Sequence, residues 1–93
     1  MPQFPGRFVG YEIAPVAEID GDGINPCSSM QEATALSERT FWSLYGTTPE
    51  GTAMCIGDYR EYEWCAEIYS RITGHVLPDN PDGLRLTALP AYR

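Results

Sequence analysis

The chain has 93 residues, of which 13 are acidic and six are basic, so its formal net charge at pH 7 is −7 and its isoelectric point is near 4.4. A surface with this charge repels phosphate groups, which argues against direct binding to nucleic acid or to an anionic membrane, and favours a partner with a basic surface. The length predicts a single small domain over residues 1–93, with one core and no room for a deep pocket.

The cysteine content and the absence of long apolar runs predict a cytoplasmic protein. Three cysteines without a close pair fit reduced thiols better than a disulfide framework. The start, MPQFPGRFVG, lacks the apolar run of a signal peptide, and no stretch approaches the roughly 20 apolar residues of a membrane span.

The first quarter of the chain predicts an arm followed by a strand. Residues 1–7 contain two prolines and a glycine, which indicate an irregular arm. Residues 8–19 alternate in the manner of a strand, and Pro15 predicts that this strand lies at a sheet edge or carries a bulge there, because proline donates no ladder hydrogen bond. A glycine-rich turn at 20–23 leads to a brief return as strand at 24–25.

A short helix and a hairpin follow. Ser29 and Glu32 have the spacing of a capping box, which predicts a helix over residues 29–39. Residues 41–45, FWSLY, form an apolar and aromatic strand, and the turn chemistry of residues 46–51 predicts a hairpin loop.

The strongest helical signal covers residues 58–73. The second hairpin strand ends at Asp58, which is predicted to cap this helix, and Gly74 is predicted to end it in a left-handed conformation. The predicted apolar stripe consists of Cys65, Ile68, Tyr69 and Ile72. The tail at 75–93 contains three prolines and is predicted to be irregular.

Together these elements predict an α+β domain. Its antiparallel sheet has three to four strands, and the main helix packs on one face to complete a ββα core. A short extra helix precedes the hairpin.

The stretches FWSLYG, PEGTAMCIGDY and AEIYSRITG, preceded by YEIAPVAEIDGDG, resemble a group of small proteobacterial proteins carried on plasmids and other mobile elements. The group shares an FWSxYG phrase, a glycine-containing hairpin, an IGDY phrase and a helix ending in RITG. This resemblance covers about residues 11–74 apart from the segment at 29–39, and it implies a genomic setting, but no mechanism and no site residue.

One turn has part of a calcium-loop pattern. Asp20, Asp22 and Asn25 resemble the start of such a loop, but Ile24 and Gln31 stand where further oxygen ligands would be required. We therefore predict an ordinary turn, with no metal site and no cofactor.

The sequence also contains few residues that are suited to catalysis. Cys27, Cys55, Cys65 and His75 lack the close spacing of zinc ligands, and a thiol nucleophile would need an adjacent imidazole. We predict no catalytic residue, and the protein is not expected to be an enzyme.

The aromatic residues are the more informative signal, because they are too many for one small core. We assign three of them to the core: Trp42, Trp64 and Tyr69. Tyrosines beside carboxylates are typical of protein interfaces. The predicted partner-binding residues are Tyr59, Glu61, Tyr62, Glu63 and Glu67.

The expected function is stoichiometric protein binding by an acidic mobile-element protein. Its most concrete form is an inhibitor of a host defence complex, such as an anti-CRISPR protein that binds the basic channel of a CRISPR effector. The alternative is a homodimeric structural or regulatory module, so the chain is expected to be a monomer or a homodimer. A small enzyme ranks third.

Overall fold

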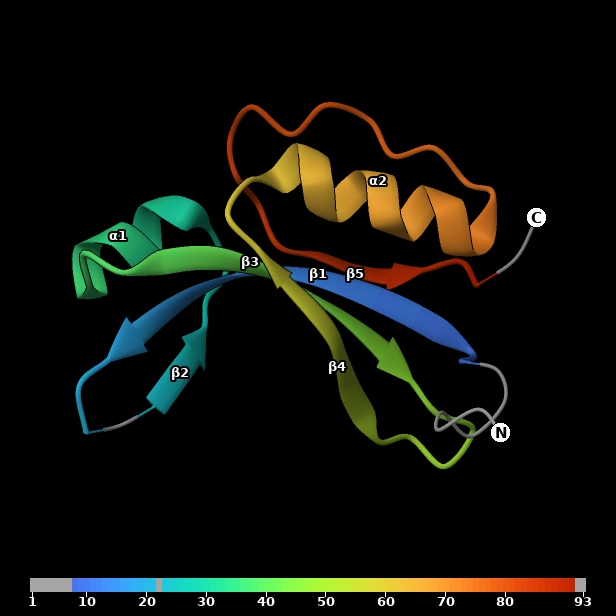
Figure 1. The fold of residues 1–93 in the computed structure, drawn as a ribbon, viewed down its shortest axis with the longest axis horizontal. Helices are drawn as coiled ribbons and strands as arrows, with labels where there is room; N and C mark the ends of the chain where they lie inside the picture. The colour runs from blue at the N-terminus through green and yellow to red at the C-terminus, as the bar shows by residue number, and fades with distance from the viewer. Residues whose placement is uncertain (1–7, 22, 92–93) are drawn as a thin grey trace.

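The computed structural model describes residues 8–21 and 23–91, which form five strands and two helices (Figure 1). In chain order the elements are β1 (Gly10–Ile19), β2 (Gly23–Pro26), α1 (Met30–Leu36), β3 (Thr40–Thr47), β4 (Ala53–Tyr59), α2 (Tyr62–Thr73) and β5 (Leu86–Leu89). Figure 1 shows both helices on the same side of the sheet. The predicted arm at 1–7 lies outside the described residues.

All five strands belong to one antiparallel sheet that is organised around β1. The strand order is β2-β1-β3-β4, and β5 pairs with β1 on the same side as β2. This arrangement of sheet and helices confirms the predicted α+β class. The fifth strand comes from the segment at 75–93, which was expected to be irregular.

Pro15 lies in the middle of a central strand, so the prediction of an edge or a bulge there is wrong. Pro15 is opposite Trp42 of β3, and on its other side its carbonyl oxygen accepts a hydrogen bond from Cys27 N at 2.8 Å. The nitrogen of a strand residue points to the same side as its oxygen. On that side, β1 pairs with β5 up to Ile13 and with β2 from Val16 onward. The position of the missing N–H therefore falls between these two pairings. No ladder bond is lost at this point.

The core lies between α2 and one face of the sheet. Ile13 is opposite Leu44 in the register, so both side chains point to this face. The rings of Tyr11 and Tyr69 meet edge to face at 5.6 Å, which joins β1 to α2. The buried cluster consists of Phe8, Tyr11, Ile13, Trp42, Leu44, Tyr62, Cys65 and Tyr69.

Side chains fix the amino end of α1 as the sequence predicts. Ser29 Oγ accepts a hydrogen bond from Glu32 N at 3.1 Å, and the Glu32 carboxylate accepts one from Ser28 N at 2.7 Å. The capping box is thus present, although the second bond comes from the residue before the cap. The helix ends at Leu36, earlier than the predicted end at residue 39.

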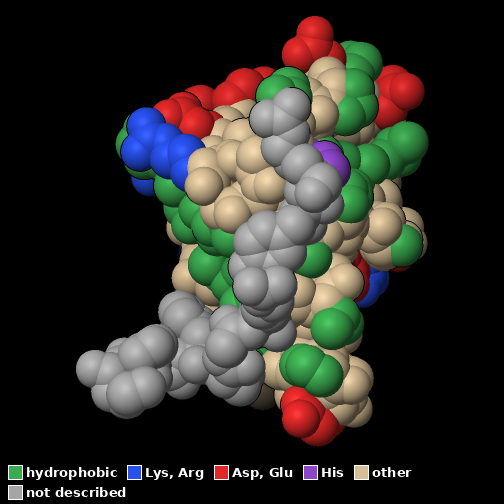
Figure 2. Space-filling model, turned by 90° about the vertical axis from the view of Figure 1, so that its right-hand side faces the viewer, with side chains coloured by type: hydrophobic (Ala, Val, Ile, Leu, Met, Phe, Trp, Pro, Cys, Tyr) green, Lys and Arg blue, Asp and Glu red, His purple; other side chains and the backbone are tan. Residues whose placement is uncertain are grey.

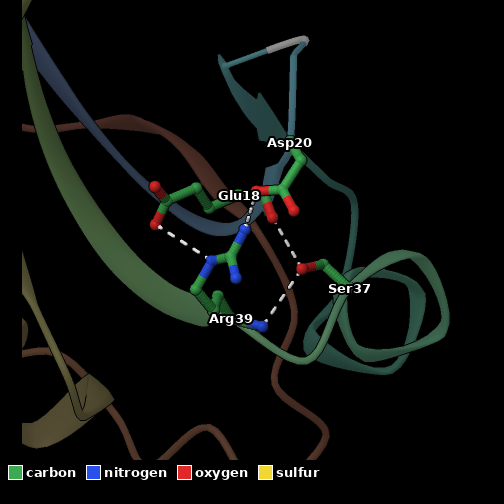
Figure 3. A network of polar contacts seen from close by, with 4 residues as sticks. All are labelled: Glu18, Asp20, Ser37 and Arg39. Atoms are coloured by element: carbon green, nitrogen blue, oxygen red, sulfur yellow. Dashed lines mark hydrogen bonds and ion pairs between the residues drawn. The ribbon is translucent and has the colours of Figure 1, made fainter.

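A polar network holds the segment between α1 and β3 against the end of β1 (Figure 3). Ser37 Oγ donates to Glu18 O at 2.6 Å and accepts from Arg39 N at 3.1 Å. The Arg39 guanidinium pairs with Asp20 and lies 3.7 Å from Glu18 Oε1. Because these side chains are exposed, we assign the network to loop positioning more than to net stability.

The start of α2 differs from the prediction. The helix begins at Tyr62, and Asp58 is still part of β4, opposite Ser43. The Ser43 hydroxyl donates to Asp58 Oδ1 at 2.6 Å, so this carboxylate satisfies a sheet residue and caps no helix. Glu61 takes the N-cap position without a side-chain cap bond. The assignment of Asp58 as the cap is therefore wrong.

The segment after α2 folds back along the helix and joins the sheet. Gly74 ends α2 with φ of 83°, which confirms the predicted left-handed stop. Tyr62 Oη donates to Pro78 O at 3.0 Å, and Tyr69 Oη donates to Pro90 O at 2.7 Å. The two buried tyrosines thus fasten the tail to the core at two points.

Candidate partner-binding surface

The three glutamates of the predicted site lie at the amino half of α2. Glu61, Glu63 and Glu67 are all exposed, as expected, while their role in binding stays a prediction. Glu67 forms an ion pair with Arg71 at 2.6 Å, in which both side chains are more than half exposed. An exposed pair of this kind adds little to stability, so Glu67 can exchange its partner at low cost.

Tyr62 is buried, so it does not share the exposed surface of the glutamates, while its role in binding stays a prediction. Its side chain is 8% exposed, and its ring packs edge to face against Trp42 with centroids 5.2 Å apart. Burial raises the pKa of the Tyr62 hydroxyl above its usual value. The residue faces inward because it lies on the same side of α2 as the buried Cys65 and Tyr69.

Tyr59 is half-buried at the end of β4, where it pairs with Trp42 of β3. Its hydroxyl lies over Gly57, where an added Cβ would come within 2.5 Å of the oxygen. Burial raises the pKa of Tyr59 as well. Only part of this ring is therefore available to a partner.

Trp64 was assigned to the core, but its side chain is 66% exposed. The residues of α2 that are buried instead are Tyr62, Cys65, Tyr69 and Thr73. This set is rotated from the predicted stripe, so Ile68 is only half-buried and Ile72 is 39% exposed. The rotation places Trp64, Ile68 and Ile72 together on one side of α2.

A broad open hollow of about 600 Å³ lies between α1, the amino end of α2 and the turn at 80–83. Its rim carries the carboxylates of Glu61, Glu63 and Asp82. Trp42 and Tyr62, both nearly buried, contribute aromatic surface below them. We call this group of five residues the acidic hollow.

The charge of the acidic hollow is negative, because three carboxylates share its border with one arginine, Arg60. Figure 2 views the molecule from the carboxyl end of α2, on the face away from the hollow, and shows that acidic side chains also gather along the top of the molecule there. Such a surface attracts a cationic group before any contact is made.

A second, more apolar surface lies beside β4. We call it the Trp64 flank, and define it by Trp64, Ile68 and Ile72 of α2 together with the outer edge of β4. One open hollow of about 470 Å³ is lined by Asp58, Tyr59, Arg60, Glu61 and Trp64. Another of about 290 Å³ is lined by Trp64, Glu67, Ile68 and Arg71. The two hollows meet at the exposed indole.

The described residues offer weak support for nucleophilic or metal chemistry. Burial raises the pKa of the Cys65 thiol to about 12, and burial together with Asp58 raises that of Cys55. Across residues 8–21 and 23–91, no group of three or more potential ligands could hold a metal ion. Asp22 of the calcium-like turn lies outside the described residues.

The structure brings together one polar cluster that the sequence analysis missed. The hydroxyl of Ser43 and the thiol of Cys55 both donate to Asp58 Oδ1, at 2.6 and 3.4 Å. His75 is the one histidine of the chain, and its ring stacks on Tyr69 at 6.5 Å in the core region. Asp58 therefore orients this cluster within the sheet, and no imidazole is placed to act on it.

The two surface residues that sequence reasoning missed are Trp64 and Asp82. Residue type alone favours burial of Trp64, and only the phase of the helix reveals its exposure. Asp82 lies in the segment PDNPDG, whose composition predicts a turn but not which side chains the turn approaches.

No protein-family model, curated protein or solved structure matches the chain. Within the part of the chain that the structure describes, neither helix is long and apolar enough to cross a membrane.

Proposed function

We propose that the protein acts by stoichiometric binding to a partner protein with a basic surface, and that the acidic hollow receives a basic side chain of this partner. The observation that carries the proposal is that three carboxylates, those of Glu61, Glu63 and Asp82, line one open hollow together with Trp42 and Tyr62. An arginine or lysine side chain can place its charge among the carboxylates and its apolar stem against the aromatic surface.

The charge of the whole chain supports the same mode of action. A net charge of −7 on 93 residues produces a field that accelerates encounter with a basic protein. Such steering acts mainly on the association rate and weakens as salt is added. The acidic hollow would then provide the local contact that follows encounter.

The most specific form of the proposal is an inhibitor of a host defence complex, such as a CRISPR effector. The channels of these effectors are basic because they hold nucleic acid, and carboxylates can take the electrostatic place of phosphate. The resemblance to mobile-element proteins supplies a setting in which such an inhibitor would be useful.

A pair of matched charge reversals tests whether the acidic hollow is the contact site. Glu63→Arg with Asp82→Arg changes two rim residues, whereas Glu38→Arg with Glu50→Arg makes the same change in net charge at exposed residues away from the hollow. The partner is captured from a host lysate with the unmodified chain, and binding kinetics are then measured at two salt concentrations. We expect the rim variant to bind more weakly and with a smaller salt dependence than the control variant. Equal losses in the two variants would mean that only net charge matters.

The defence-inhibitor form has its own test. The chain is expressed in a bacterial strain with an active CRISPR system, and transformation by a targeted plasmid is counted. Recovery of transformants that the Glu63→Arg, Asp82→Arg variant fails to produce would support this form. If the unmodified chain gives no recovery, this form is abandoned, while binding to the captured partner still decides the broader proposal.

A further inference from the structure

The Trp64 flank combines two features that a protein rarely leaves exposed together: an apolar helix surface and a long free strand edge. Trp64 is 66% exposed and Ile72 is 39% exposed, and helical spacing puts both on one side of α2. Trp64 lines a hollow together with Asp58 and Tyr59 of β4. Hydrophobic side chains cover the left of the view in Figure 2, beneath a basic group. An aromatic anchor within such a patch is typical of a protein contact.

The outer edge of β4 offers backbone groups for pairing. Within the described chain, β4 is the last strand of the path β2-β1-β3-β4. Thr47 O accepts a hydrogen bond from Val9 N at 2.7 Å, so Thr47 directs its backbone toward the β1 side. Its register partner Ala53 must then direct its N–H and C=O away from β3, toward the free edge. By alternation, Cys55 directs its backbone groups the same way.

The three outer strands of the sheet differ in how well their edges are protected. β2 and β5 have four residues each, and a proline ends or follows each of them, Pro26 and Pro90. β4 has seven residues without proline and with one charged residue, Asp58. Its remaining protection is the register shift near Tyr45. Short strands, prolines and charges are the usual means of blocking edge pairing, so β4 is the open edge.

The charges of the Trp64 flank complement a second copy of the same surface. Arg60 lies at the amino end of α2, and it has no ion-pair partner among the described residues. Glu67 lies near the middle of α2, and Arg71 lies toward its carboxyl end. Two copies related by a two-fold axis beside β4 run antiparallel, which brings Arg60 of each toward Glu67 of the other. The two helix dipoles also oppose each other in this arrangement.

The flank is also less acidic than the rest of the chain. The residues that line its two hollows include three acidic and two basic side chains, whereas the whole chain has 13 acidic and six basic residues. Like-charge repulsion between two copies is therefore smaller here than at the acidic hollow, where three carboxylates accompany one arginine.

We propose that the Trp64 flank is a self-association surface, on which a second copy of this chain docks by antiparallel pairing of the two β4 strands and covers Trp64. Arg60 and Glu61 line both the flank and the acidic hollow, whereas Glu63 and Asp82 line the hollow and not the flank, so these two carboxylates stay accessible in such a dimer. The dimer would therefore still present them twice to a basic partner. The self-association does not rest on the proposed function.

Sedimentation velocity over a range of protein concentrations tests the proposal. We expect a monomer–dimer equilibrium, and Trp64→Glu should raise the dissociation constant by about tenfold or more, because a charge replaces the central aromatic contact. Val76→Glu is the matched control, since Val76 is an apolar residue that is 87% exposed on the tail. A monomer at every concentration would overturn the proposal, as would a dimer that Trp64→Glu leaves unchanged.

Two further variants keep the test informative if Trp64→Glu disturbs folding. Ala53→Pro removes an outward N–H at the first residue of β4, and Ala53→Val retains it, so only the former should weaken the dimer. Arg60→Glu should weaken the dimer, and addition of Glu67→Arg should restore part of the loss. Equal dimerisation of Ala53→Pro and Ala53→Val, with no effect of Arg60→Glu, would contradict β4 pairing.

Salt dependence and cross-linking separate this surface from the proposed contact with a basic partner. Added salt screens both the repulsion between two acidic chains and the Arg60–Glu67 attraction between them, so dimerisation should change less with salt than binding to a basic partner, which weakens. Cys55 is the exposed thiol, and Cys27 and Cys65 are buried. A short bismaleimide should therefore link two copies through Cys55, and Cys55→Ser should abolish the link. A dimer that weakens with salt as steeply as binding to the basic partner does, or that never links through Cys55, would argue against this interface.

Discussion

Both sides of α2 carry large hydrophobic side chains, but one side is buried and the other is exposed. The inward side presents Tyr62 and Tyr69, and each hydroxyl donates to a carbonyl oxygen of the tail. The outward side presents Trp64, which is 66% exposed, and the partly exposed Ile68 and Ile72. The comparison teaches that hydrophobic character alone does not place a residue in the core of a small protein.

The inward side can be buried because its polar atoms have hydrogen-bond partners. A buried tyrosine needs an acceptor for its hydroxyl, and the chain after Gly74 passes close enough to supply Pro78 O and Pro90 O. The outward side has no such requirement for its aliphatic residues. It can stay exposed in a monomer or be covered by another chain.

Truncation of the inward side should have the largest effect. Tyr69→Ala removes a fully buried ring that contacts Tyr11 and is bonded to Pro90, so the free energy of unfolding should fall by about 3–5 kcal/mol. Urea denaturation of the variant measures this loss. A value within 1 kcal/mol of the unmodified chain, on the order of a surface substitution, would mean that the inward side is not the core side.

The Cys65 thiol predicts a loss of stability at alkaline pH. Its pKa is about 12 in the folded chain, against an ordinary value of 9.0, so above pH 9 the unfolded chain releases a proton that the folded chain keeps. This contribution is complete below pH 9 and is lost as pH rises toward 12. The free energy of unfolding should therefore fall with pH more steeply in the unmodified chain than in Cys65→Ala, by up to about 1.4 kcal/mol per pH unit. Parallel curves from pH 9 upward would show that the thiol is not desolvated.

Removal of one tyrosine hydroxyl should have a smaller effect. Tyr62→Phe keeps the ring against Trp42 but deletes the bond to Pro78 O, which should cost about 1 kcal/mol. The segment near Pro78 should also become more sensitive to proteases in this variant. If stability and protease resistance are both unchanged, a solvent molecule replaces the lost bond.

The outward side should contribute least to the fold of one chain. Trp64→Ala should change the free energy of unfolding by no more than about 0.5 kcal/mol when measured at concentrations where the chain is monomeric. A loss close to that of Tyr69→Ala would mean that Trp64 packs within its own chain. The comparison between the two sides of α2 would then fail.

Local chemistry was predictable from the sequence where it depends on near neighbours. The cap by Ser29, the stop at Gly74 and the hairpin between β3 and β4 each depend on residues a few positions apart. Such signals fixed the order of most elements and the α+β class. They could not reveal β5, because its pairing with β1 depends on residues at opposite ends of the sequence.

The errors at α2 have one physical origin. Asp58 has the spacing of a helix cap, but Ser43 of β3 competes for its carboxylate, and β4 continues to Tyr59. The side of α2 that faces the sheet is likewise set by contacts of Tyr62 with Trp42 and of Tyr69 with Tyr11, and Trp64 is left exposed. Contacts with residues distant in sequence thus decided which aromatic residues could form the candidate site.

The pairing of β1 with β5 also sets the order in which the fold can form. Glu12 of β1 and Arg85 beside β5 form an ion pair across 73 positions of sequence. The contacts of β1 with β2 and of β3 with β4 enclose much shorter loops, so they carry a smaller entropic penalty on closure.

The rate-limiting transition state for folding should therefore contain the β3–β4 hairpin and α2 while the last strand is still detached. Substitutions at Leu86 or Leu89 should then accelerate unfolding and leave the refolding rate nearly unchanged. Until β5 docks, the hydroxyls of Tyr62 and Tyr69 depend on solvent for hydrogen bonds. Docking of β5 is therefore expected to be the last step of folding and the step that slows unfolding of the native chain.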